Sequence, residues 1–142
     1  MTGSGLSGIG DPEWVNVVPT DRYLTSYLLL TDPSYPETSL VVVRAPSPDD
    51  GKFADVVLDC LGALTGWQGV DGYEATRVVL STGNFVPVGN CANGTHKLTS
   101  AAPFTVTVWG WGNLETTPPT GWASYAYVAG MDWSLREIAP PL

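Results

Sequence analysis

The chain has 142 residues, of which 44% are hydrophobic and only 14% charged, and its formal net charge is −8. This length suits one domain that buries its own core. Because 14 acidic residues face 6 basic ones, the sequence excludes nucleic acid and anionic membranes as favoured partners. No apolar run approaches the ~20 residues that cross a bilayer, so membrane insertion is not expected.

The first residues, 1–12, are rich in glycine and serine and are interpreted as a flexible lead-in or tag remnant. A single domain is expected over residues 13–142. The start shows no basic region followed by an apolar stretch, which is what a signal peptide would need. We interpret the chain as a piece of a longer exported protein.

Short apolar and β-branched segments alternate with turn residues along the rest of the chain. After an apolar segment at 14–18, strands are expected at 26–31, 39–44, 53–58, 73–80, 95–99, 104–111, 122–128 and, in the tail, 131–138. Loops are expected at 45–52, 60–72, 81–94 and 114–120, with a turn at Ala101-Ala102-Pro103. No long stretch has a helical period. Eight or nine short strands predict an all-β fold, an antiparallel β-sandwich of jelly-roll or Greek-key type.

The clearest strand pattern is at 104–111. Phe104, Val106 and Val108 would point one way, and Trp109 and Trp111 the other, together with two threonines. One face of this strand must therefore belong to the core.

Aromatic residues gather in the last third of the chain. Exposed tryptophan and tyrosine rings bury the faces of sugars well, which makes Trp111, Trp122 and Tyr125 candidate ligand-binding residues. The alternative is that these rings pack inside the molecule, between or against its sheets.

The two cysteines, Cys60 and Cys91, lack the spacing of a metal site. They are either two buried thiols or one disulfide, which we favour. A loop of about 30 residues closed in this way stabilises a protein by about 3–4 kcal/mol in the chain-entropy model. The triplet Asn93-Gly94-Thr95 matches a glycosylation acceptor, but Asn-Gly is interpreted first as a hairpin turn.

Catalytic residues are not expected. A serine–histidine–aspartate arrangement would have to use His96, and no GxSxG motif is present. A structural hydrogen bond is the expected role of this histidine. The neighbouring carboxylates, Asp49 with Asp50 and Asp55 with Asp59, could serve a glycosidase only inside a cleft, and solvated turns are their expected setting.

Calcium is the one metal that the sequence brings into consideration. Asp49, Asp50 and Asp55 offer clustered oxygen ligands and are the candidate metal residues, although their spacing matches no EF-hand. No other cofactor is expected.

A sequence pattern in the last third of the chain resembles the N-terminal domain of the IgGFc-binding protein family, in a bacterial exported form. The pattern consists of Cys91, Asn93-Gly94, His96, Leu98-Thr99-Ser100, Pro103-Phe104, Val106, Val108-Trp109-Gly110-Trp111, Ser124-Tyr125-Ala126-Tyr127 and Ala129-Gly130. Residues 55–60 and Thr76-Arg77 are similar to the mid-section of the family, so the resemblance spans residues 21–138. Val128 departs from it, since family members often carry proline there.

The resemblance implies a disulfide between Cys60 and Cys91 and no catalytic residues. It also implies an adhesion or recognition module of a large secreted or cell-surface protein. The expected partners are a protein or glycan on another surface and neighbouring domains of the same polypeptide. The expected contact surface is made of the loops 45–52, 61–72 and 114–121. The alternatives are a carbohydrate-binding module using exposed tryptophan and tyrosine, and a structural spacer or assembly domain of a surface fibre.

Overall fold

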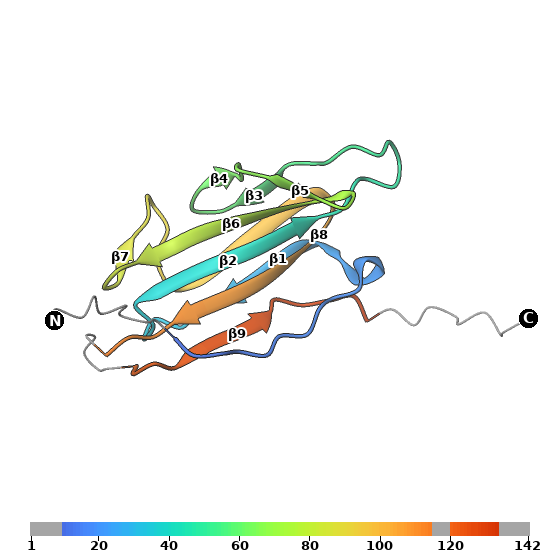
Figure 1. Ribbon diagram of the computed structural model, residues 1–142. Helices are drawn as coiled ribbons and strands as arrows, with labels where there is room; N and C mark the ends of the chain where they lie inside the picture. The colour runs from blue at the N-terminus through green and yellow to red at the C-terminus, as the bar shows by residue number, and fades with distance from the viewer. Residues whose placement is uncertain (1–9, 115–119, 134–142) are drawn as a thin grey trace, which may run out of the picture.

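A computed structural model describes residues 10–114 and 120–133, which form nine antiparallel strands and one short 3-10 helix (Figure 1). The helix is η1 (Thr20–Arg22). The strands are β1 (Leu24–Leu30), β2 (Glu37–Arg44), β3 (Val56–Leu58), β4 (Gly62–Ala63), β5 (Gln68–Val70), β6 (Tyr73–Thr82), β7 (Val86–Pro87), β8 (Thr95–Trp111) and β9 (Ser124–Val128). The predicted all-β, antiparallel sandwich-like fold is confirmed. None of the described residues forms a helix long and apolar enough to span a membrane.

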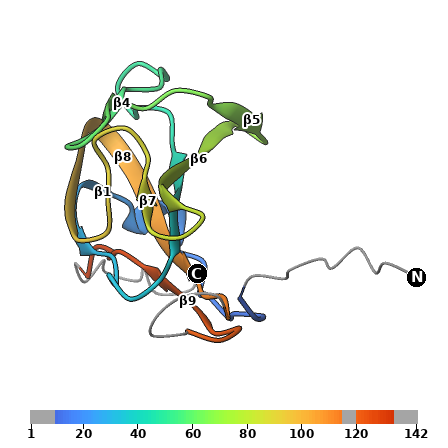
Figure 2. The same cartoon turned by 90° about the vertical axis from the view of Figure 1, so that its left-hand side faces the viewer.

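The strand β8 organises the fold because it runs through both halves of the curled sheet. Its first half pairs with β1 on one edge and β3 on the other, and its second half pairs with β9 and β2. The strand order is β4-β3-β8-β2-β6-β5, with β7 beside β6. Figure 2 shows the result, a single sheet that curls over on itself and encloses the core.

The bend in β8 replaces a predicted turn. Residues 95–99 and 104–111 were expected to be two strands joined by a turn at Ala101-Ala102-Pro103, but they form one strand. Leu24 pairs with Phe104 and Ser26 with Thr99, so the extra residues of β8 are taken up in a bulge. The bulge also accommodates Pro103, which has no N–H to donate, while the Pro103 carbonyl accepts a bond from the Ala45 amide at 3.2 Å. The strand therefore turns a corner without leaving the sheet.

The core lies on the concave face and follows the predicted alternation. Phe104, Val106 and Val108 are fully buried, whereas Trp109 and Trp111 lie on the convex face of the same strand. The concave face also takes side chains from β1, β2, β3 and β6, namely Tyr27, Leu29, Leu40, Val42, Val56, Leu58 and Leu80. Leu98, in the first half of β8, belongs to the same core, and Gly110 follows Val108 on the same side of the strand.

Other predicted elements are present with shorter or additional pieces. Residues 53–58 contribute only β3, while the loops 60–72 and 81–94 contain the short strands β4, β5 and β7. Residues 131–133 form no strand, and the rest of the expected tail strand lies outside the described residues. Of the predicted lead-in, 1–9 lie outside the described residues. Gly10 and Asp11 are bonded to Gly112 and Ser124 next to β9.

Candidate functional site

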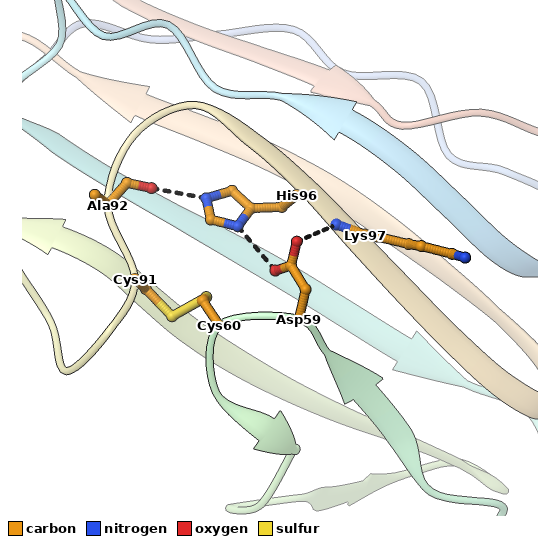
Figure 3. The surroundings of a disulfide bond; sticks show 6 residues. All are labelled: Asp59, Cys60, Cys91, Ala92, His96 and Lys97. Atoms are coloured by element: carbon orange, nitrogen blue, oxygen red, sulfur yellow. Dashed lines mark hydrogen bonds and ion pairs between the residues drawn. A yellow bond between two sulfur atoms is a disulfide. The ribbon is translucent and has the colours of Figure 1, made fainter.

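The first polar cluster surrounds the disulfide. Cys60 follows β3, Cys91 precedes β8, and their Cα atoms are 5.1 Å apart, so the predicted disulfide is present. Beside it, His96 Nδ1 lies 3.1 Å from Asp59 Oδ1, and Nε2 lies 2.7 Å from the Ala92 carbonyl oxygen (Figure 3). We call Asp59, Cys60, Cys91 and His96 the disulfide clamp.

The chemistry of the disulfide clamp is structural. A carbonyl oxygen only accepts hydrogen bonds, so His96 Nε2 donates to Ala92 and is occupied where a catalytic base would need it free. The amide of Lys97 donates to Asp59 Oδ2 at 2.9 Å. Partial burial raises the pKa of Asp59, but the bonds from His96 and Lys97 outweigh it and hold the pKa below its usual value.

The same residues make a poor metal-binding site. Within the described part of the chain, Asp59, Cys60 and His96 are the one set of three potential ligands whose atoms lie within 4.8 Å of one another. The sulfur of Cys60 is already bonded to Cys91, so it offers no thiolate.

Among the described residues, the three candidate calcium residues form no such group of neighbouring ligand atoms. Asp50 Oδ1 accepts a bond from the Lys52 amide, and Asp50 Oδ2 lies 3.8 Å from Lys52 Nζ. Asp55 lies 4.0 Å from the Arg44 guanidinium, at the other end of the loop. Asp49 is exposed, and its amide donates to Ser47 Oγ.

A buried arginine contacts one predicted contact loop and the residues that follow another. The guanidinium of Arg44 lies 4.0 Å from the ring centre of Trp67 and 5.5 Å from that of Phe53, and it bonds Glu74 Oε2 through Nε and Nη2. It also donates to the Ala54 carbonyl at 2.7 Å. The contacts with Phe53 and Ala54, which directly follow the loop 45–52, and with Trp67 in the loop 61–72 thus hold both segments against Arg44. The charge-assisted pair with Glu74 ties β2 to β6.

The three candidate aromatic residues do not form one platform. Trp111 stacks on Trp109, with ring centres 5.4 Å apart, on the convex face of the sheet. Gly10 passes directly over it, since a Cβ at that glycine would sit 2.6 Å from the Trp111 ring. Trp122 is 45% exposed. In β9, Ser124 pairs with Trp111, so the next residue, Tyr125, points to the opposite, concave side.

Tyr125 instead belongs to a second cluster, at the edge of the core. It lines an open hollow of about 440 Å³ together with Leu30, Asp32, Pro33, Tyr35 and Tyr127. We call this the tyrosine hollow. Sequence reasoning missed Asp32 and Tyr35. The alternation of Tyr125 with Tyr127 signals a shared face, but nothing in the sequence places Tyr35 beside them.

A comparison with protein families identifies the family to which this chain belongs. The model of the family described as IgGFc binding protein matches residues 1–110, more than half of the chain. The chain belongs to the IgGFc binding protein family. The match ends at Gly110, ahead of β9. No curated protein and no solved structure matches the chain. The match confirms the family that the sequence resembles, and this family is one of binding domains.

Proposed function

We propose that this domain is a non-catalytic recognition module of a larger secreted or cell-surface protein and binds a protein partner through its loops. Membership of a binding family is the observation that carries this proposal. The disulfide supports an oxidising, extracellular setting. The occupied His96 Nε2 supports a role without catalysis.

The loop surface that we propose is rigid and partly apolar. Arg44 holds the β2–β3 connection at Ala54 and the loop 61–72 at Trp67. The β2–β3 loop and the β5–β6 turn lie at one end of the sandwich (Figure 1). Val70 is 56% exposed there, and Leu61, in the separate turn between β3 and β4, is 50% exposed. Exposed apolar side chains on a fixed scaffold are well suited to protein contact, because little order has to be gained on binding. The third predicted loop, 114–121, is described only at its two ends.

An array of extracellular proteins that includes the IgG Fc fragment would test this function. We expect a protein signal that the loop variants Leu61→Asp and Val70→Asp weaken and that Trp122→Ala leaves unchanged. Loop variants that bind every protein on the array as well as the parent chain does would contradict the proposal.

A carbohydrate-binding module is the second candidate, favoured by the exposure of Trp122. It predicts a signal on a glycan array that Trp122→Ala abolishes. A spacer or assembly domain predicts no ligand on either array, together with self-association of the chain.

A further inference from the structure

The tyrosine hollow is built from three segments that are distant in the sequence. Leu30 ends β1, the turn that follows it carries Asp32, Pro33 and Tyr35, and β9 supplies two more tyrosines. Two hydrogen bonds hold the hollow together. The Tyr127 hydroxyl donates to the Leu30 carbonyl at 2.5 Å, and the Asp32 amide donates to the Tyr125 hydroxyl at 3.0 Å. The β9 rings are therefore fixed before any ligand arrives.

The rings meet as a corner. Tyr35 and Tyr125 have ring centres 4.6 Å apart and planes at 78°, while Tyr125 and Tyr127 are 6.2 Å apart and nearly parallel at 18°. Gly110 makes this possible, because a Cβ there would lie 1.9 Å from a Tyr125 ring carbon. The face of an aromatic ring carries negative partial charge and attracts cations. Rings at a near-right angle can offer such faces to one group.

The charged groups near the three tyrosine rings are negative, like the partial charge on the ring faces. Asp32 is exposed, and its Oδ1 accepts bonds from the amide and hydroxyl of Ser34, at 2.8 and 2.7 Å. Its Oδ2 and the Tyr35 hydroxyl have no hydrogen-bond partner within the described residues. Burial raises the pKa of Tyr35, and the charges of Asp32, Glu13 and Asp11 raise it further. Three carboxylates thus act on this ring.

We propose that the tyrosine hollow binds the cationic end of a lysine or arginine side chain presented by a polypeptide partner. The site is neutral in its rings and negative at its rim, and the whole chain carries a net charge of −8, so a basic partner is electrostatically complementary. The source of the cation rests on the proposed function as a protein-binding module. The chemistry of the hollow does not, and it is tested separately.

Small probes test the hollow directly, with the tyrosine ring resonances as the NMR readout. The cationic probes are N-acetyl-arginine amide and N-acetyl-lysine amide, and the neutral ones are the citrulline and norleucine amides. We expect the cations to shift the resonances of Tyr35, Tyr125 and Tyr127, with affinity that falls as salt rises. The neutral probes should leave these resonances in place. Equal binding of neutral and cationic probes would overturn the proposal.

Variants separate the ring faces from the charge. Tyr35→Leu removes one wall and should weaken cation binding by about three- to tenfold. Asp32→Asn, an exposed change that spares the fold, should weaken it by about threefold and reduce the salt dependence. Trp122→Ala, outside the hollow, should leave the affinity unchanged. Unaltered affinity in the Asp32→Asn variant would contradict the proposal even if Tyr35→Leu did not fold.

The source of the cation is tested with short peptides that contain one arginine or lysine, compared with tetramethylammonium. Tighter binding of the peptides supports a side chain of a polypeptide. Tighter binding of tetramethylammonium would overturn that assignment in favour of a small quaternary ammonium ligand. Failure of the protein array leaves the small-probe result standing, so the two proposals fail independently.

Discussion

The disulfide clamp and the tyrosine hollow are both polar clusters beside the core, yet they differ in whether their polar atoms have hydrogen-bond partners. In the disulfide clamp, both ring nitrogens of His96 and both carboxylate oxygens of Asp59 have protein partners. In the tyrosine hollow, Asp32 Oδ2 and the Tyr35 hydroxyl have none within the described residues. A cluster whose polar atoms are all paired stabilises the fold, and one with free groups at its rim can bind a ligand.

The two clusters are also connected. The loop that carries Cys91 continues to Asn93, whose Nδ2 donates to the Tyr35 carbonyl at 2.8 Å. The next residue, Gly94, bonds Thr31 through both its N–H and its carbonyl. The disulfide clamp thereby supports the turn on which the tyrosine hollow is built. Substitutions in the two clusters should therefore affect the stability of the fold and the binding of cationic probes to different degrees.

Removal of the disulfide should have the largest effect on stability. Cys60 and Cys91 are 31 positions apart, so the Cys60→Ser/Cys91→Ser double variant should lose about 3–4 kcal/mol of unfolding free energy. Urea unfolding of both proteins measures this difference. Below the melting temperature of the variant, the cationic probes should still bind, because the hydroxyl bonds of Tyr125 and Tyr127 remain. Loss of binding in the folded variant would show that the clamp itself shapes the hollow.

Gly110→Ala should affect both stability and binding. The new methyl group would overlap the Tyr125 ring, and overpacking of this kind costs about 1–3 kcal/mol. The displaced ring should also weaken binding of the cationic probes. Gly69→Ala is the matched control, since a Cβ there meets nothing within 4 Å. Thermal melting and NMR titration check both expectations, and equal behaviour of the two variants would contradict the assigned role of Gly110.

The fold was largely predictable from the sequence because alternation reports burial directly. The pattern Phe104, Val106, Val108 identified the core face of β8 correctly. The bend at Ala101-Ala102-Pro103 was predicted wrongly as a turn, because a proline and two small residues suit a bulge as well as a turn. Asn93-Gly94 was likewise expected as a hairpin turn, but it forms a bend that bonds Thr31, since the flanking segments do not pair with each other.

The candidate site was much less predictable. The sequence pointed to Trp111, Trp122 and Tyr125 as candidate ligand-binding residues. The residue between the two tryptophans, Gly110, is the one that matters to the hollow, because it admits the ring of Tyr125 from the neighbouring strand. Tyr35 and Tyr125 meet only through long-range pairing, and spacing in the sequence carries no trace of that contact. Local patterns predict which face a side chain takes, but not which distant side chain it meets there.

Asn93→Ala should break the connection between the two clusters. The Asn93 side chain makes two hydrogen bonds, to the Tyr35 carbonyl and with the Ser81 hydroxyl, so its loss should cost about 1–2 kcal/mol of unfolding free energy. The ring resonances of Tyr35 should also shift. Asn90→Ala, in the same loop and exposed, serves as the control and should change neither property. Tyr35 resonances that stay unmoved in the Asn93→Ala variant would show that the turn holds its shape without the clamp loop.

The smallest effect should be the pH dependence of the disulfide clamp. The pKa of Asp59 is lowered in the folded chain, so its contribution is fully present above the unfolded value of about 3.9 and is lost as the pH falls through the lower folded value. Wild type and Asp59→Asn should therefore differ in melting temperature near neutral pH and converge in acid. Asp49→Asn removes the same charge from an exposed loop position and gives the reference for a general charge effect. A difference for Asp59→Asn that matches this reference at every pH would show that the bonds to His96 and Lys97 contribute nothing beyond net charge.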